Sequence, residues 1–353
     1  MSESWPVVIL GGTGYVAGEM ARLVSGHPNL TLAATVSTTR AGTPVREVFP
    51  HLAPATGDMC FSTLDEALDR IESARESVLL SAAPHGESAA IIGQALDRAG
   101  KAGVRLTAVD ASADFRFSDP EAFAAVYGKP HPRPELLPEF TCAVPEHAKS
   151  ADTPHAAQPG CFATSMLLGI VPLIMAGLTE PTFDVSAITG STGAGRKPRD
   201  TTHHPERQSN LFAYQPLVHR HQPEVRALAE AATGHTIELN FVPHSGPFAR
   251  GIHATLVSRL AVDATSEDVN RTLADFYAES PLVGVPAALP RIKDVAGSCH
   301  AAVSARVEGR TVVVCSVIDN LLKGAAGGCL QWVNRRLGLP EGLGLTAPAP
   351  GWI

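Results

Sequence analysis

The stretch Val7-Val8-Ile9-Leu10-Gly11-Gly12-Thr13-Gly14-Tyr15-Val16-Ala17-Gly18-Glu19 has the pattern of a strand, a glycine turn and the start of a helix. Glycines in such a turn let the backbone approach a pyrophosphate at the helix N-terminus, although a tight strand-to-helix loop also needs them. A second strand, 30–36, follows at the spacing of a dinucleotide-binding unit. The stretch therefore predicts a cofactor turn, with candidate binding residues Gly11, Thr13, Gly14, Tyr15 and Val16.

The end of that second strand indicates which nicotinamide cofactor fits. A chain that binds NAD usually carries Asp or Glu there for the ribose 2′-hydroxyl. This chain has Ser37-Thr38-Thr39-Arg40 instead, where hydroxyls and a guanidinium suit a 2′-phosphate and no carboxylate repels it. A solvated loop is the alternative interpretation. We expect NADP(H), bound here by Ser37, Thr38 and Arg40.

The order of strands and helices predicts the fold class. Alanine-rich helical segments alternate with strands at 77–82 and 105–110, which predicts an α/β fold with a Rossmann-type, doubly wound parallel sheet. Residues 119–160 are rich in proline, and we expect an irregular connection there. From Cys161 on, long β-branched strands predict an α+β domain with a largely antiparallel sheet and helices on one face. Those strands are 183–189, 238–243, 250–261 and 301–317, and a last helix spans 319–337.

The length of 353 residues exceeds one ordinary core, so we expect two domains. An NADP-binding domain is expected at 1–160, completed by the C-terminal helix within 319–353. A catalytic and oligomerisation domain is expected at 161–318. This second domain offers a flat sheet face for self-association.

The amino-acid composition limits the kinds of partner that the protein can bind. The formal net charge of −7 and the lack of a Lys/Arg-rich block argue against a nucleic-acid surface. The apolar runs are too short to span a bilayer and the first residues lack a signal-peptide pattern, so we expect no membrane partner and a cytoplasmic location. Six cysteines without CxxC spacing fit reduced thiols better than disulfides or a zinc module.

Cys161 is the strongest candidate for a reactive group. It lies in Gln158-Pro159-Gly160-Cys161-Phe162-Ala163-Thr164-Ser165, which is followed by an apolar run typical of a buried helix. A thiol on the first turn of a helix faces unsatisfied N–H groups and the positive end of the helix dipole, and both lower its pKa. The alternative is a small buried hydrophobe, which is our interpretation of the other five cysteines.

Further polar or glycine-rich segments lie next to the expected strand ends and helix starts. They are Ala83-Pro84-His85-Gly86, the segments 110–116, 190–197 and 219–224, Pro243-His244 with Arg250-Gly251, and the segment 319–327. Pro84 and His85 would lie near the nicotinamide, at the carboxyl ends of the strands. Ser191, Gly193 and Asn320 are further candidate contacts to the cofactor.

Together these segments resemble the family of N-acetyl-γ-glutamyl-phosphate reductases, within the wider superfamily of aspartate-semialdehyde dehydrogenase. The resemblance covers nearly the whole chain, through the motifs GGTGY, SADFR, PGCFATS, GSTGAGRK, HRHQPE, VPH…RG and DNLLKGAAG. It implies an NADPH-dependent reduction of an acyl phosphate in arginine biosynthesis and a homodimer or homotetramer. Gln158 stands where the family usually has Asn, and Phe162-Ala163 where Tyr-Pro is common, which leaves the substrate length open.

The chemistry of such a reductase assigns a role to each candidate. A thiolate at Cys161 attacks the acyl phosphate, a thioester forms, and hydride then reduces it to the aldehyde. The resemblance points to the HRHQPE motif for proton transfer, and we favour His221 over His219 as the acid/base. Backbone N–H groups near Cys161 and within 191–195 are candidate oxyanion donors. Candidate substrate contacts are Arg116, Ser191, Arg196, Lys197, His219 and Glu224.

Several alternatives stay open. The alternative to substrate binding is that three basic side chains are only surface charges, namely Arg116, Arg196 and Lys197. His219, His221 and Glu224 have the residue types of a zinc site, but the chemistry needs no metal and we expect none. The substrate is alternatively that of the related lysine-pathway aminoadipyl-phosphate reductase or of aspartate-semialdehyde dehydrogenase. A redox-sensing NADP-binding regulator without catalysis is the alternative of another class, although it should lack the cysteine or the imidazole pair.

Overall fold

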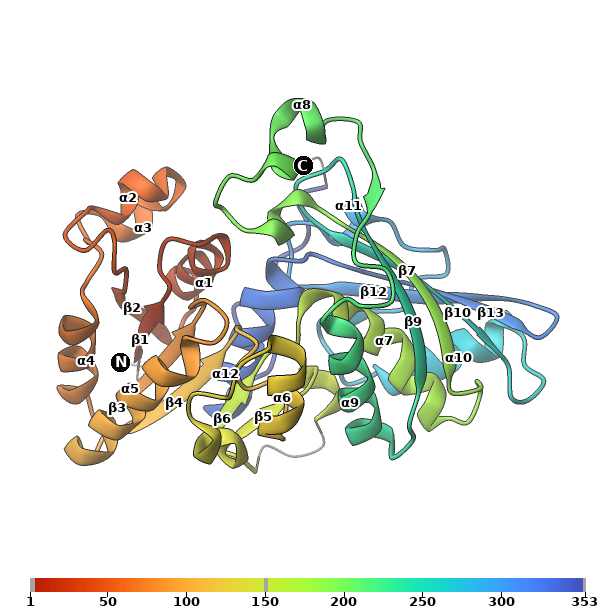
Figure 1. Cartoon of the computed structure of the whole chain (residues 1–353), viewed down its shortest axis with the longest axis horizontal. Helices are drawn as coiled ribbons and strands as arrows, with labels where there is room; N and C mark the ends of the chain where they lie inside the picture. Colours follow the sequence, from red (N-terminus) through yellow and green to blue (C-terminus); the bar gives the residue numbers. More distant parts are fainter. Residues whose placement is uncertain (1–3, 149–151, 352–353) are drawn as a thin grey trace. The chain divides into compact units, whose positions relative to one another are not determined.

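The computed structural model describes residues 4–148 and 152–351, which pack as two units (Figure 1). The first unit comprises Met1–Cys142, Ser150–Gln158 and Ala326–Leu345, and the second comprises Ala143–Lys149, Pro159–Ala325 and Thr346–Ile353. The second unit thus includes four segments that we expected in the first domain, namely 143–149, 159–160, 319–325 and 346–353. A buried ion pair joins 143–149 to 319–325, since Lys323 Nζ lies 2.5 Å from Glu146 Oε1 and both side chains are fully buried.

The first unit contains a six-stranded sheet in the order β2-β1-β3-β4-β6-β5, with every pair parallel. Val8 and Leu10 of β1 pack with the helices α4 and α5, while Val7 and Ile9 are equally buried on the opposite face. This confirms the doubly wound Rossmann-type sheet. Its strands are β1 (Trp5–Leu10), β2 (Leu30–Thr35), β3 (Glu76–Ser81), β4 (Arg105–Asp110), β5 (Phe140–Cys142) and β6 (His155–Ala157).

Helices on the first sheet come from both ends of the chain. The C-terminal helix α12 packs against α1, β4 and β6, and Asn334 Oδ1 is 3.0 Å from His27 Nε2. The proline-rich region 119–160 is more regular than expected, because it contains a helix (α6) and two strands. The longer helices of this unit are α1 (Tyr15–Ser25), α4 (Leu64–Glu72), α5 (Ser88–Ala102), α6 (Pro120–Tyr127) and α12 (Gly327–Arg336).

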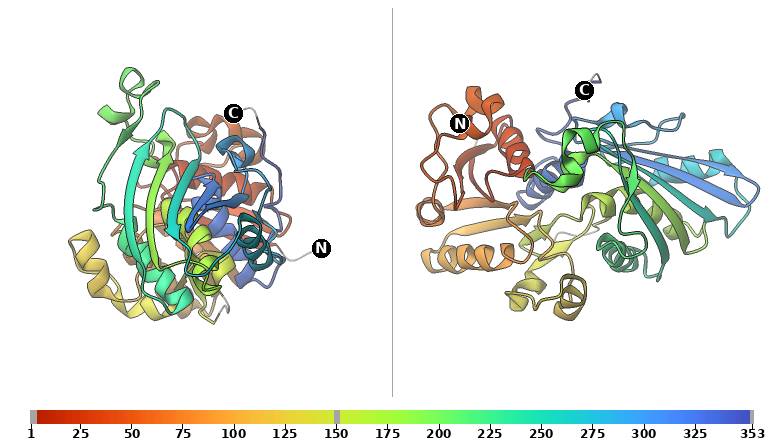
Figure 2. Two further views of the ribbon diagram at one scale, coloured as in Figure 1. Left: turned by 90° about the vertical axis from the view of Figure 1, so that its right-hand side faces the viewer. Right: turned by 45° about the horizontal axis from the view of Figure 1, so that its top comes forward.

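The second unit contains a seven-stranded sheet in the order β11-β12-β13-β10-β7-β9-β8. Figure 2 shows it as a twisted layer of green to blue strands. The sheet is mixed, since β7–β9 and β11–β12 pair in parallel and the other pairs are antiparallel. Its strands are β7 (Thr182–Thr189), β8 (Phe212–Ala213), β9 (Glu238–Ser245), β10 (Ile252–Arg259), β11 (Val283–Gly284), β12 (Ala301–Glu308) and β13 (Thr311–Ile318).

Two expected elements of this unit divide in the structure. The expected strand 301–317 is the hairpin β12–β13, turned at Gly309 with φ +54°. The expected last helix begins with a π-helical turn, η6 (Leu322–Ala326), and continues as α12. The long helices of the unit are α7 (Cys161–Met175), α9 (His221–Thr233) and α10 (Ser266–Phe276). Across the described residues, no helix combines the length and apolarity that crossing a membrane requires.

Candidate active site

The glycine turn between β1 and α1 is shaped for a ligand as well as for the fold. Gly11 has φ +70°, and a Cβ there would lie 2.4 Å from the Ala82 carbonyl oxygen, so the fold itself requires glycine. A Cβ at Gly14, by contrast, would meet only the Gly11 oxygen at 3.7 Å. Gly14 is the N-cap of α1, with no side-chain cap and no acidic residue in the first turn. The turn therefore leaves room and N–H groups for a pyrophosphate.

The Ser37–Arg40 segment follows β2 as an ordered turn. Ser37 is buried, and its Oγ accepts a hydrogen bond from the Arg40 N–H at 3.2 Å. The Thr38 and Arg40 side chains are exposed. Ser37 thus holds the turn, while Thr38 and Arg40 carry the groups that can contact a ribose phosphate.

The Pro84–Gly86 turn after β3 is held by the segment that follows β4. The buried carboxylate of Asp114 accepts from the N–H groups of Gly86 at 2.5 Å and Ala89 at 3.0 Å. His85 Nδ1 accepts from the Ala113 N–H at 3.0 Å, so His85 carries its proton on Nε2 when neutral. Pro84 and His85 are therefore positioned at the carboxyl end of the parallel sheet.

Arg116 is buried in the first unit and bonds to two backbone carbonyls there. Its Nε donates to the Gln158 carbonyl at 3.1 Å and its Nη2 to the Ala111 carbonyl at 2.9 Å. These bonds tie the end of β4 to the segment before Cys161. They rule out the interpretation of Arg116 as a solvated surface charge, since the side chain is only 6% exposed.

Cys161 is the first residue of α7, as the apolar run predicted. Gly160 is the N-cap and has no side chain to accept from the first-turn N–H groups, and no acidic residue lies in that turn. Every residue from 162 to 174 is buried, whereas Cys161 is partly exposed. The thiol is therefore the accessible group at the positive end of an apolar helix.

The start of α9 meets the start of α7. Glu224 is fully buried, and its Oε1 accepts from the Gly160 N–H at 2.6 Å. His221 is the first residue of α9, and a Cβ at Gly160 would lie 2.3 Å from its Nε2. The absent side chain at 160 thus admits the His221 imidazole next to the residue that precedes the thiol.

His219 supports His221 rather than duplicating it. The His219 Nδ1 accepts from the backbone N–H of His221 at 3.2 Å, and the two rings lie 4.8 Å apart. Burial lowers the pKa of His219 to about 4, so the ring is neutral at physiological pH. Phe162 and Tyr214 contact the His219 ring edge-on, at 5.7 and 5.6 Å.

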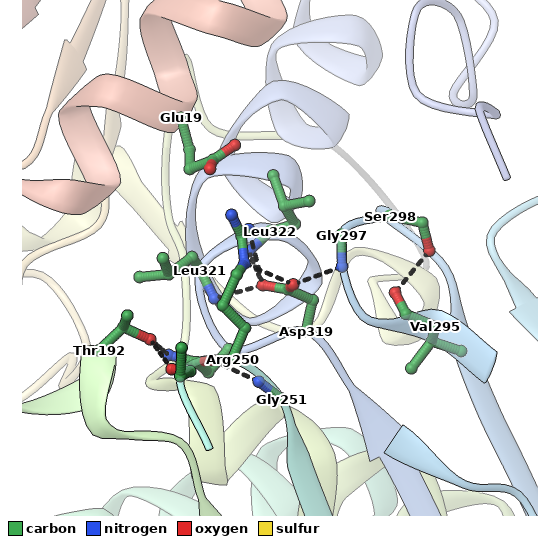
Figure 3. A network of polar contacts seen from close by, with 12 residues as sticks. Glu19, Thr192, Arg250, Gly251, Val295, Gly297, Ser298, Asp319, Leu321 and Leu322 are labelled. Atoms are coloured by element: carbon green, nitrogen blue, oxygen red, sulfur yellow. Dashed lines mark hydrogen bonds and ion pairs between the residues drawn. The ribbon is translucent and has the colours of Figure 1, made fainter. Parts of the chain in front are cut away.

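The motif DNLLKGAAG packs against the thiol. A Cβ at Gly324 would lie 2.7 Å from the Cys161 Cβ, so η6 passes directly against the start of α7. Asp319 is buried and accepts from Arg250 and from the N–H groups of Gly297, Leu321 and Leu322 (Figure 3). This network fixes the backbone from β13 into η6.

The glycine-rich segment 190–197 differs in part from the expectation that its N–H groups are oxyanion donors. The N–H groups of Ser191, Thr192, Gly193 and Gly195 all donate to backbone carbonyls, so they are not available to an oxyanion. The Arg196 and Lys197 side chains are exposed on the following loop. Asn320, a predicted cofactor contact, uses its amide to accept from the Gly251 N–H at 2.8 Å and to donate to Thr192 Oγ1 at 3.0 Å.

Sequence reasoning missed two residues of this unit. Tyr214 lies beside His219, and Arg207 is buried in the loop that precedes it. A short segment without periodicity carries no sequence signal for one buried side chain. Within the described ranges no group of three His, Cys, Asp or Glu side chains is arranged to hold a metal ion.

Comparison with known proteins identifies the family and the fold. The family description "Semialdehyde dehydrogenase, NAD binding domain" matches residues 6–150, and "Semialdehyde dehydrogenase, dimerisation domain" matches residues 161–320. The fold is shared with aspartate semialdehyde dehydrogenase II of Vibrio cholerae in complex with ASA (TM-score 0.70, 16% identity, covering 96% of this chain and 99% of that one). It is also shared with the Candida albicans aspartate semialdehyde dehydrogenase with NADP (TM-score 0.66, 14% identity, 97% and 100%).

Relatives with higher sequence identity to this chain than these two structures are reductases. The N-acetyl-gamma-glutamyl-phosphate reductase of Desulforudis audaxviator is 38% identical over 349 residues, which cover 97% of this chain and 98% of that protein. The reductase of the same name from Pseudomonas aeruginosa is 39% identical over 350 residues, with 97% and 98% covered. The chain is an enzyme of the semialdehyde dehydrogenase class with a nicotinamide-binding domain. Within that class it belongs to the N-acetyl-gamma-glutamyl-phosphate reductase family.

Proposed function

We propose that the protein reduces N-acetyl-L-glutamyl 5-phosphate to N-acetyl-L-glutamate 5-semialdehyde and phosphate, with NADPH, in arginine biosynthesis. The observation that carries the proposal is the junction of α7 and α9. There a partly exposed thiol at a helix start lies one residue from Gly160, where the His221 imidazole enters. Family membership supplies the substrate class, because the curated relatives carry that name.

The thiolate of Cys161 attacks the acyl carbonyl. A C–S bond forms, the bond to the phosphate oxygen breaks, and phosphate leaves with its electron pair. When bound, the nicotinamide would supply the hydride that reduces the resulting thioester. His221 donates a proton to the oxygen and takes it back as the C–S bond breaks, which returns the thiolate and releases the aldehyde. His219 is neutral and orients His221, so we assign the acid/base role to His221 and a positioning role to His219.

We assign most of the cofactor contacts to the first unit. The glycine turn, with Gly11, Thr13, Gly14, Tyr15 and Val16, fits a pyrophosphate, and the 84–86 turn provides Pro84 and His85 for the nicotinamide end. The exposed Thr38 and Arg40 after β2, with no carboxylate beside them, favour the 2′-phosphate of NADP over NAD. Ser191, Gly193 and Asn320 remain proposed cofactor contacts, and Arg116, Arg196 and Lys197 remain proposed contacts to the anionic groups of the substrate.

We also propose a homodimer or homotetramer in the cytoplasm. The domain description that matches 161–320 is a dimerisation domain. The helix α7 packs on β10, β12 and β13, and the opposite face of this sheet carries partly exposed β-branched residues, including Thr255, Val257 and Val313. That face is the proposed contact between copies, and size-exclusion chromatography with light scattering tests the assembly. All six cysteines are thiols, which suits a reducing compartment.

The assay of choice runs in the oxidative direction. Phosphate-dependent reduction of NADP is expected with N-acetylglutamate semialdehyde and not with aspartate semialdehyde. Cys161→Ser should lower the rate of this reaction by several orders of magnitude while NADPH binding persists, because a serine hydroxyl has too high a pKa to form the nucleophile. Equal rates with both aldehydes, or an active Cys161→Ser variant, would contradict the proposal.

A further inference from the structure

Arg207 is a buried cation in an otherwise exposed loop. It is the last residue of α8 (His204–Arg207), at the tip of the excursion between β7 and β8 (Figure 1). Every other residue from 203 to 211 is exposed, whereas Arg207 is 7% exposed. All three of its guanidinium nitrogens are buried, and none has a hydrogen-bond partner among the residues that the structure describes. The guanidinium lies 5.9 Å from the centre of the Phe212 ring.

The buried Arg207 guanidinium therefore lacks a hydrogen-bond acceptor within the described part of the chain. Burial lowers the pKa of Arg207, but an arginine side chain keeps its charge in proteins. A buried charge without a partner is unfavourable, so such a group is expected to bind an anion. The planar fork of an arginine matches a carboxylate through two parallel hydrogen bonds.

The position of Arg207 connects it with the thiol. Its neighbour Phe212 belongs to β8, which leads to Tyr214, and the Tyr214 ring lies 5.6 Å from His219. Burial raises the pKa of Tyr214, and the charge on Cys161 raises it further, while Arg220 and Arg207 lower it. The Cys161 thiol and the Arg207 guanidinium therefore both influence the pKa of the Tyr214 hydroxyl, and all three residues belong to the second unit.

We propose that Arg207 binds the α-carboxylate of the acyl substrate and so selects acylglutamyl substrates over acyl phosphates without a carboxylate. This inference rests on the proposed function. The phosphate is bonded through one of its oxygens to the carbon that Cys161 attacks, and it leaves during the reaction. The carboxylate lies several bonds away and stays with the substrate through both steps, which suits a fixed, buried cation that binds a non-reacting part of the molecule.

The test compares two aldehydes in the oxidative direction. N-acetylglutamate semialdehyde carries the carboxylate, and 4-acetamidobutanal is the same molecule without it. Arg207→Met should lower kcat/KM for the first aldehyde by about 10- to 100-fold, mainly through KM, and leave kcat/KM for the second unchanged. The KM for phosphate should not move. Arg207→Lys should restore part of the loss, and Arg271→Met, at an exposed arginine of α10, should change neither aldehyde.

An equal loss on both aldehydes, or a raised KM for phosphate, would overturn the assignment. Thermal unfolding gives a readout without turnover. The ligand-free Arg207→Met protein should melt at or above the wild-type temperature, and N-acetylglutamate should raise the Tm of the wild type only. A large drop in the Tm of the variant would show a structural role and also overturn the proposal. If the wild type oxidises neither aldehyde, the proposed function fails, while the N-acetylglutamate shift still decides the role of Arg207.

Discussion

Glu224 accepts a hydrogen bond from the Gly160 N–H at 2.6 Å, and this bond joins the first turn of α9 to the residue before Cys161. The carboxylate is fully buried, so it acts as a fixed acceptor rather than as a solvated charge. Because His221 begins the same helix, the bond sets the position of the imidazole relative to the start of α7. The HRHQPE motif therefore supplies two parts of one arrangement, a proton carrier and its anchor.

Replacing Gly160 with alanine should damage catalysis without unfolding the protein. The added Cβ would lie 2.3 Å from His221 Nε2 and displace the ring. We expect turnover to fall by roughly 10²–10⁴, the usual contribution of a positioned acid/base, with NADPH affinity unchanged. The control is Gly100→Ala in α5, where a Cβ meets nothing within 4 Å. Stopped or slowed turnover in both variants would refute this account of Gly160.

The two histidines should differ in the pH profile. Aldehyde oxidation needs the acid/base imidazole to be neutral, so its rate should rise with pH as that imidazole loses its proton and then level off. His221→Asn should remove that limb. Burial holds the pKa of His219 at about 4, so His219→Asn should lower the rate but keep the limb. Loss of the limb in His219→Asn alone would exchange the two assignments.

The same depressed pKa predicts acid sensitivity of the fold. An unfolded histidine binds a proton near pH 6.5, whereas His147, His155 and His219 each have a pKa of about 4 in the folded protein. The unfolded state thus binds more protons between these values, and the free energy of unfolding falls as pH drops from 6.5 to 4, by at most about 3 kcal/mol per histidine. Asp110, whose pKa burial raises to about 6, opposes this trend.

Urea unfolding at pH 7, 6 and 5 measures that effect. His219→Asn should flatten the dependence relative to wild type, because one proton-binding difference is removed. His235→Asn, at an exposed position, is the matched control and should leave the slope unchanged. A stability that is flat from pH 7 to 5 in the wild type would show that the burial effect is absent.

Arg40 should decide between the two cofactors. Arg40→Ala is expected to weaken NADPH binding by about 1–3 kcal/mol, the scale of a charge-assisted hydrogen bond, and to leave NADH binding nearly unchanged. Fluorescence titration of each reduced cofactor measures both affinities. Arg75→Ala, at another exposed arginine of the same unit, should affect neither. Equal losses for NADPH and NADH would remove Arg40 from the 2′-phosphate site.

Local patterns predicted the parts of this fold that local forces determine. The glycine turn, β4 and the start of α7 at Cys161 follow from apolar runs bounded by glycine and proline. The parallel pairing of β7 with β9 did not follow, because strand order depends on contacts between distant segments. The hairpin at Gly309 was missed because β-branched residues continue on both sides of a two-residue turn.

The site shows the same division. Cys161 and the imidazole pair lie in motifs, so composition and spacing indicated them. The bond from Glu224 to Gly160, the contact of Gly324 with Cys161 and the burial of Arg207 all join residues that are distant in sequence or lack periodicity. Four of the expected oxyanion donors in 191–195 are engaged for a related reason, since the N–H groups of Ser191, Thr192, Gly193 and Gly195 meet the carbonyls of 248 and 249 and of the turn itself.

Mass spectrometry of the acylated enzyme tests the central claim most directly. The protein is mixed with N-acetylglutamyl phosphate in the absence of NADPH, quenched in acid and digested. We predict one N-acetylglutamyl group in thioester linkage on the peptide that contains Cys161, which hydroxylamine removes and which Cys161→Ser lacks. An unmodified Cys161 peptide from an enzyme that turns over when NADPH is added would contradict the account.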